Sequence, residues 1–504
     1  MNKDCSNNQI STSLSQRGYG IVKDSISTKT LGKIKKKLTV APFQPGNFGV
    51  KPTPFILYMD SPSKLYVPRY FGLLECGKAT KNTLKLSNSE SLRSEIIFQG
   101  SLRQVQLEAQ KAYLEGIKNT LGGGLINLPC GYGKTILALG LISNPVIRKK
   151  TLIVVHKEFL LHQWKERIKT FLPEAKIGVI QQKKIEIDGF DIVIGMLQSI
   201  AMKQYPKDTF SVFGFVIIDE CHHLGAEVFS RALPKINSSY MLGLSATPDR
   251  KDGLRCVFEW YIGPMLYQIE SKNTDTVWVE WWQYSDSNPQ FQVEEKTLKG
   301  TINTPKMITR LCEWSDRTDK IIQKIETCYK EGRKILVLSD RRGHLDDILQ
   351  RCLKNELSVG CYIGGMTRVE LALSEEKRII LGTYAMASEG MDIPALNTVI
   401  LATPKSDVKQ SVGRIFRQQV KDRTHIPLII DIVDQIPNFV RQSSKRKTLY
   451  RKCGYIFKYL DKDLNPLDIL TPKKSKNTHK QDVSELDRHT SLKFSSCLFD
   501  SDDD

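Results

Sequence analysis

The chain has 504 residues, a net charge of +19 and a pI near 9.3, with 40% hydrophobic and 26% charged residues. These values are typical of a folded protein with roughly two to four domains, and they exclude a chain too polar to bury a core. No apolar run is long enough to span a bilayer, and the first residues lack the apolar core of a secretory signal. We therefore expect a protein that is not secreted, has no membrane partner and stays on the cytosolic side of membranes.

Cysteine spacing and charge narrow the function further. The eleven cysteines include no Cys-x-x-Cys pair, which excludes a zinc ribbon and favours reduced thiols over a disulfide framework. The positive surplus favours a polyanionic partner, and nucleic acid is the default. A merely soluble basic protein is the alternative, because Lys-rich tails supply part of the charge.

The N-terminal part is expected to hold a disordered arm at residues 1–16 and a small module at 17–95. The module contains an aromatic and basic segment at 65–71. Such a cluster more often forms a small core than a base-stacking platform, so its chemistry stays open.

Strand-like and helix-like segments alternate from about residue 96. Uninterrupted apolar runs at 151–155, 191–194 and 215–218 favour buried parallel strands, and the pattern returns at 335–338, 378–381, 398–401 and 428–432. We predict an α/β fold with two domains, 96–265 and 306–437, joined by a linker with a β excursion at 266–305. A basic extension at 438–471 and a disordered tail at 472–504 complete the organisation. Within the extension, the basic and aromatic stretch 441–459 is expected to contact a nucleic-acid backbone.

A phosphate-binding loop is predicted at residues 128–135. Gly131 and Gly133 allow tight turns whose amides hold a polyphosphate. Lys134 is placed to reach the outer phosphates and the Thr135 hydroxyl to hold Mg²⁺, with a helix N-terminus following. The alternative is a chance Gly-Lys-Thr in a turn.

Two carboxylates follow the buried strand 215–218. In an α/β sheet this strand end opens onto the ligand crevice, so Asp219 is expected to hold Mg²⁺ and Glu220 to polarise the attacking water. A surface turn after a buried strand is the alternative. His222 and His223 do not predict a metal centre, since no third ligand is close in sequence.

Residues 410–417 are the candidate for transition-state contacts from the second domain. Arg414 and Arg417 lie three apart and are expected on one helical face, where two guanidinium groups stabilise γ-phosphate charge. A surface ion-pair helix is the alternative. Ser245 and Thr247 follow another apolar segment and give a weak signal alone.

The order of these motifs resembles that of a superfamily 2 helicase with two tandem RecA-like domains. The resemblance implies ATP and Mg²⁺ as ligands, nucleic acid as partner, and motor action without need of an oligomer. It assigns adenine reading to Gln106, and nucleotide or catalytic roles to Gly390, Asp392 and Gln410. Further matching segments are 155–157, 195–199, 245–247, 338–341 and 382–392.

Within the superfamily, the Asp-Glu-Cys-His form and residues 247–253 resemble the group of the XPB repair helicase and the phage UvsW helicase. Residues 384–394 and 402–407 look most like helicases of large cytoplasmic DNA viruses, including the poxvirus transcript-release helicase and its asfarvirus relative. This resemblance implies a DNA helicase or translocase moving 3′ to 5′ on DNA or RNA–DNA hybrids, in transcript release, repair or recombination. It further implies a cytoplasmic viral factory or the virion as location and the transcription machinery as partner. An RNA helicase and a non-catalytic nucleic-acid scaffold remain as alternatives.

Overall fold

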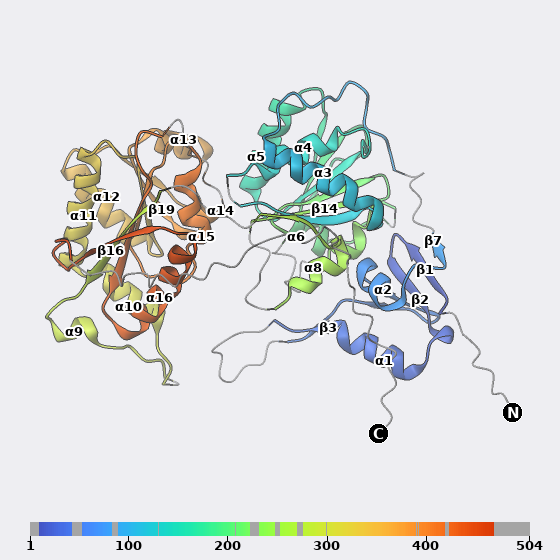
Figure 1. Ribbon diagram of the computed structural model, residues 1–504, viewed down its shortest axis with the longest axis horizontal. Helices are drawn as coiled ribbons and strands as arrows, with labels where there is room; N and C mark the ends of the chain where they lie inside the picture. Colours follow the sequence, from blue (N-terminus) through green and yellow to red (C-terminus); the bar gives the residue numbers. More distant parts are fainter. Residues whose placement is uncertain are drawn as a thin grey trace, which may run out of the picture. The chain divides into compact units, whose positions relative to one another are not determined.

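The computed structural model describes residues 10–42, 53–82, 89–129, 131–206, 208–221, 231–246, 253–269, 276–298, 300–389, 391, 393–418 and 423–467. The chain divides into two units, the first ending at Ile269 and the second beginning at Glu270, each with its own sheets and cores (Figure 1). Among these residues, none of the helices combines the length and apolar character that a bilayer crossing requires.

An eight-stranded sheet forms the centre of the first unit. Its order is β11-β10-β12-β9-β13-β14-β8-β15, and all neighbours are parallel except β10 and β11. Every position of the central strands β9 and β13 is buried, because helices cover both faces. The strands are β8 (Gly123–Asn127), β9 (Thr151–Val155), β10 (Ile177–Gln181), β11 (Lys184–Ile185), β12 (Ile192–Met196), β13 (Phe215–Ile218), β14 (Tyr240–Ser245) and β15 (Met265–Gln268).

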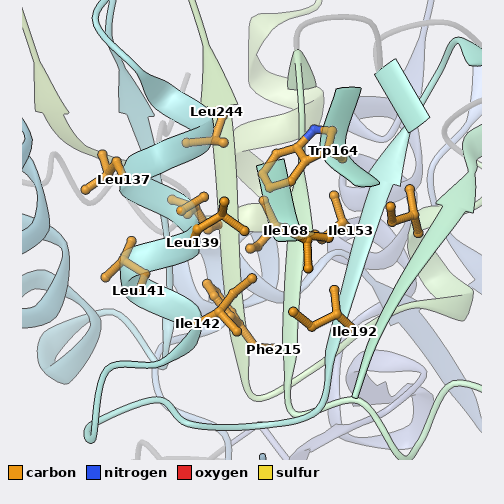
Figure 2. Packing of buried hydrophobic residues seen from close by; sticks show 14 of the residues in the cluster. Leu137, Leu139, Leu141, Ile142, Ile153, Trp164, Ile168, Ile192, Phe215 and Leu244 are labelled. Carbon is orange, nitrogen blue, oxygen red and sulfur yellow. The ribbon is translucent and has the colours of Figure 1, made fainter. Parts of the chain in front are cut away.

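Two apolar cores lie on the two faces of this sheet. Figure 2 shows the larger one, where Leu141 of one helix and Trp164 and Ile168 of the next pack on Ile153 and Phe215 of the strands. The helices on this face are α3 (Gln104–Asn119), α4 (Lys134–Ile142) and α5 (Glu158–Phe171). The helices that contribute to the other core are α6 (Leu197–Met202), the short helix η4 (Leu233–Lys235) and α8 (Arg255–Ile262).

The small N-terminal module is a five-stranded sheet of order β5-β6-β2-β1-β7 with two helices. The module belongs to the first unit. Its core includes Val257 of α8 and Leu254, which directly precedes that helix. In addition, the Tyr70 hydroxyl donates a hydrogen bond to the Thr120 carbonyl at 2.5 Å. The elements are β1 (Thr12–Ser15), β2 (Gly18–Val22), η1 (Lys23–Ser25), α1 (Thr28–Lys37), β3 (Thr39–Val40), β4 (Phe55–Ile56), β5 (Met59–Asp60), β6 (Lys64–Val67), α2 (Arg69–Cys76) and β7 (Lys81–Asn82).

The second unit holds a fully parallel sheet of order β18-β19-β17-β20-β21-β16-β22. Its strands are β16 (Trp278–Tyr284), β17 (Ile335–Ser339), β18 (Val359–Tyr362), β19 (Ile379–Thr383), β20 (Thr398–Leu401), β21 (Leu428–Asp434) and β22 (Ile456–Leu460). Its helices are α9 (Pro289–Gln292), α10 (Thr304–Cys312), α11 (Ser315–Lys330), α12 (Arg342–Lys354), α13 (Arg368–Glu376), α14 (Tyr384–Glu389), α15 (Lys409–Val412), η5 (Gly413–Phe416) and α16 (Pro437–Lys452). The predicted α/β class with two tandem RecA-like domains is confirmed.

Three segments differ from the expected organisation, namely 266–305, residues 12–15 and the basic extension that begins at residue 438. The segment 266–305 holds β16, a strand inside the second sheet between β21 and β22, as well as most of β15. Residues 12–15 of the expected arm form β1, paired with β2 and β7. Residues 1–9 and the expected tail at 472–504 lie outside the described residues.

The described part of the expected basic extension, residues 438–467, belongs to the second domain. Arg446 of α16 is buried and donates to both carboxylate oxygens of Asp431 at 2.8 and 2.6 Å, while Tyr450 donates to the same carboxylate at 2.9 Å. After α16, strand β22 pairs with β16. Arg446 is thus a buried structural residue, and its burial is tolerated because the Asp431 carboxylate neutralises its charge.

Candidate nucleotide site

The predicted phosphate loop connects β8 to α4 in the first unit. Gly131 and Gly133 both have positive φ, +84° and +74°, and Gly133 is the N-cap of α4. Lys134 is therefore the first residue of the helix and Thr135 the second, and the Thr135 side chain is half-buried. Backbone amides at a helix N-terminus favour an anion, so this loop suits a polyphosphate. Cys130 lies outside the described residues.

Gln106 braces this loop from α3. Its Nε2 donates to the carbonyls of Tyr132 at 3.2 Å and Gly133 at 2.9 Å, and its Oε1 accepts from the Arg103 amide at 2.8 Å. A Cβ on residue 133 would lie 2.3 Å from that Nε2 and would displace the Gln106 amide, and the positive φ of this position independently favours glycine. The side chain is 2% exposed. It fixes the loop here, and its contact with adenine stays a prediction.

The two carboxylates of the strand end lie beside the loop. Glu220 Oε1 is 3.6 Å from Lys134 Nζ, and Lys134 also donates to the Leu128 carbonyl at 3.4 Å. Glu220 has φ +48°, a left-handed conformation that non-glycine residues rarely adopt and that is typical of functional turns. The structure therefore brings Lys134, Asp219 and Glu220 together, although they are far apart in sequence.

Asp219 is buried and held at both carboxylate oxygens. The Glu220 amide donates to Oδ1 at 3.0 Å, and the Trp164 indole Nε1 donates to Oδ2 at 2.9 Å. The pKa of Asp219 is raised to about 6, mainly by burial and to a smaller extent by the neighbouring Glu220 charge. The Lys134 charge opposes this rise. A divalent cation would relieve the same buried negative charge, so these residues fit Mg²⁺.

Trp164 is the site residue that sequence reasoning missed. Trp164 lies on the buried face of α5 with Leu161 and Ile168, and its ring is buried in the core of Figure 2. An indole carries one N–H donor, which needs a partner when buried. That need is the available signal, although nothing in the sequence names the partner.

The second unit holds the predicted arginines in different surroundings. Arg414 lies in the 3₁₀ turn η5 and is 5% exposed; its guanidinium donates to the carbonyl of Ala387 and, at 3.0 Å, to that of Met391. Arg417 follows the turn and is half-exposed, as is Gln410 on α15. The two arginines lie in and directly after a 3₁₀ turn rather than on an α-helix, because α15 ends at Val412, and their shared helical face stays a prediction.

Several predicted residues fall outside the description. Gly390 and Asp392, as well as His222, His223 and Thr247, lie outside the described residues. Ser245 ends β14 beside the loop, where its carbonyl accepts from the Leu128 amide at 3.1 Å. The catalytic and ligand roles of all the site residues stay predictions.

Two family models match this chain. One is described as Type III restriction enzyme, res subunit, and covers residues 99–250; the other, Helicase conserved C-terminal domain, covers 316–419. Protein L396 of Acanthamoeba polyphaga mimivirus, named provisionally as an ATP-dependent RNA helicase, is 39% identical over 459 residues, covering 89% of this chain and 86% of its own.

More distant relatives are also viral. QP509L of African swine fever virus (isolate Pig/Kenya/KEN-50/1950), with the same provisional name, is 26% identical over 361 residues, covering 66% of this chain and 69% of its own. The probable helicase D10 of Escherichia phage T5 is 27% identical over 343 residues, covering 66% and 72%. The likeness to an asfarvirus protein is thus found, while the poxvirus likeness stays a prediction.

A solved structure shares the fold. A fragment assigned provisionally to the HsdR subunit of a type I restriction enzyme from Vibrio vulnificus YJ016 matches with a TM-score of 0.51 and 18% identity, covering 75% of this chain and 73% of that one. The structure of T4 UvsW covers 90% of this chain and 100% of its own at 19% identity, but its TM-score of 0.37 is too low to argue from.

Proposed function

This chain belongs to the superfamily 2 helicases and is a nucleic-acid-dependent ATPase, and we propose that it is a monomeric, ATP-driven helicase or translocase whose track is DNA or an RNA–DNA hybrid. The observation that carries the motor assignment is the meeting of Lys134, Asp219 and Glu220 beside a loop whose two glycines have positive φ.

The residues of the first unit divide the chemistry among them. The loop amides and Lys134 bind the phosphates of ATP, and the 3.6 Å pair with Glu220 is exchanged for a phosphate contact when nucleotide enters. Glu220, freed from that pair, orients the attacking water and accepts its proton. Thr135 and Asp219 would hold Mg²⁺, which supplies charge neutralisation at the phosphates when bound.

The second unit contributes Arg417 in this proposal. Arg414 is already committed to two backbone carbonyls, so it holds the backbone at Ala387 and Met391 rather than reaching outward. Arg417 is more exposed and is the candidate for stabilising the γ-phosphate charge when the two domains close. Arg417→Ala should then lower nucleic-acid-stimulated turnover far more than ATP affinity. Equal losses of turnover and of ATP affinity would contradict the assignment of Arg417 to the γ-phosphate.

DNA is favoured as the track. One matching family model is named for a restriction enzyme, a class that acts on DNA, and the charge of +19 suits any polyanion. The provisional names of L396 and QP509L favour RNA instead, which makes an RNA helicase the second candidate. Because the relatives are viral, we place the activity in transcript release, repair or recombination within a cytoplasmic viral factory.

The test is stimulation of ATP turnover by length-matched ligands at one salt concentration. The arms are duplex DNA, duplex RNA and an RNA–DNA hybrid, each with a 3′ or a 5′ tail, and single-stranded DNA and RNA of the same length. The proposal expects the highest stimulation from DNA or hybrid and unwinding from the 3′ tail. Stimulation by RNA alone would replace it with the RNA helicase.

A further inference from the structure

A polar groove of about 580 Å³ lies between the N-terminal module and the first α/β domain, both within the first unit. One wall is the module's sheet, and the other is the segment after α6 together with η4. The walls are joined nearby, where Asn237 Nδ2 donates to the Ser15 carbonyl at 3.4 Å and Arg69 to the Ser238 carbonyl at 2.9 Å. The groove is therefore a built feature of this unit.

The module turns the polar face of its sheet toward this groove. Tyr66, Gly20, Ser13 and Lys81 pair in one row across β6, β2, β1 and β7, so their side chains share a face. Gly20 lets the Ser13 hydroxyl and the Tyr66 ring approach each other on that face, because a Cβ there would lie 2.9 Å from Ser13 Oγ and 3.2 Å from the Tyr66 ring. The other face of the same strands is the module's apolar core, formed by Leu14, Tyr19, Ile21, Leu65 and Val67.

Positive charge gathers on the module wall without a matching negative charge. Arg17, Lys64 and Lys81 line the groove, and its described lining contains neither Asp nor Glu. Within the described part of the chain none of the three forms an ion pair, whereas three other lysines of the module pair with carboxylates. Lys235, on the opposite wall, is committed to three backbone carbonyls at the end of α6. The three module cations therefore attract an anion.

Aromatic rings stand among these cations. The Arg17 guanidinium lies 5.7 Å from the centroid of the half-buried Tyr66 ring. On the opposite wall Tyr205 is fixed by an edge-on contact with Phe210, 5.0 Å between centroids, and by a bond to the Ser199 carbonyl. Cations that neutralise phosphates beside rings that stack on bases are the usual components of a site for single strands.

We propose that this groove binds one nucleic-acid strand, with its phosphates on Arg17, Lys64 and Lys81 and a base stacked on Tyr66. The site rests on the proposed function only in that the motor's track is a nucleic acid. It adds a contact outside the two motor domains, through which the module retains a strand while the motor cycles.

The test compares two double variants of the full chain that remove equal charge from the same module. Arg17→Gln with Lys81→Gln alters the groove, while Lys33→Gln with Lys36→Gln alters exposed lysines of α1 that do not line it. Binding of a fluorescent single-stranded oligonucleotide is measured by anisotropy across a salt series, with thermal unfolding as the check on folding. Each lost phosphate contact reduces the salt slope, the steepness with which log K falls against the logarithm of salt concentration, by about 0.7. The slope of the groove variant should therefore be smaller by about 1.4, and that of the control should equal the wild-type slope.

Tyr66→Leu gives a second, charge-free readout. Loss of one stacked base should weaken single-strand binding about fivefold or more and leave the salt slope unchanged. A groove double variant whose slope equals that of the control overturns the proposal. So does competition by polyglutamate as strong as that by the oligonucleotide, since an acidic peptide would then be the occupant.

The failures of the groove and of the motor are distinguishable. Wild-type turnover that nucleic acid does not stimulate, together with a slope difference between the two double variants, refutes the motor and supports the groove. Stimulated turnover without a slope difference refutes the groove alone.

Discussion

Trp164→Phe separates the Asp219 contact from the packing around it. The substitution keeps an aromatic ring in the core shown in Figure 2 and removes the N–H that donates to Asp219 at 2.9 Å. A hydrogen bond to a charged group contributes about 1.5–3 kcal/mol, so its loss raises the pKa of Asp219 by a further ~1–2. Since that pKa is already about 6, much of the carboxyl group becomes protonated at neutral pH.

The expected result is a higher Mg²⁺ requirement at neutral pH. At pH 7 a rise of this size lowers the apparent affinity of the carboxylate for a cation about 2- to 10-fold, because the proton competes with the metal. The assay is a titration of ATP turnover with Mg²⁺ at pH 7 and at a pH well above 8, where Asp219 is ionised in both proteins. The defect should largely disappear at the higher pH.

The matched control is Trp314→Phe in the second unit. Trp314 Nε1 donates to Asp286 Oδ2 at 2.7 Å, so the control loses the same kind of bond away from the site. It should lower stability without changing the Mg²⁺ requirement. A Trp164→Phe enzyme with a wild-type Mg²⁺ requirement at both pH values would refute the reasoning, as would an equal shift in the control.

Three further outcomes follow from local geometry. Gly133→Ala should weaken ATP binding and lower Tm more than Gly189→Ala, because both glycines have positive φ, +74° and +77°, but only the first added Cβ meets a side chain; equal thermal shifts would contradict this. His344 is buried and its pKa is lowered to about 3, so the folded state excludes a proton that the unfolded chain takes up below about pH 6.5. Stability should therefore fall as pH drops from 6.5 toward 3, and denaturant unfolding of His344→Gln should lose about 2 kcal/mol less than wild type between pH 7 and 5. Arg446→Met leaves a buried carboxylate without its partner and should cost about 3–5 kcal/mol in the same assay. Lys445→Met, at an exposed position on the same helix, should cost little.

The parts that sequence alone predicted are those with local signals. The buried strands at 151–155 and 215–218 appear at those residues, because a parallel strand covered on both faces is a continuous apolar run. Gly131 and Gly133 mark the loop, because both positions have the positive φ that favours glycine. These features depend on a few neighbouring residues.

The parts that sequence did not predict depend on partners distant along the chain. Strand β16 is inserted between β21 and β22, an order that no local pattern specifies. Arg446 looks like a surface residue until Asp431 is placed beside it in the fold. The Trp164 bond to Asp219 spans 55 residues of sequence in the same way.

The central claim is that Glu220 performs hydrolysis at a site formed by Lys134 and the glycine loop. The most direct measurement compares ATP affinity and single-turnover hydrolysis for Glu220→Gln and Lys134→Ala. The account predicts that Glu220→Gln binds ATP as the wild type does and almost ceases to hydrolyse it, since the amide keeps the shape but cannot accept the proton. Lys134→Ala should lose affinity and turnover together, because it removes a charge that faces the phosphates. Near-wild-type turnover by Glu220→Gln would contradict the account.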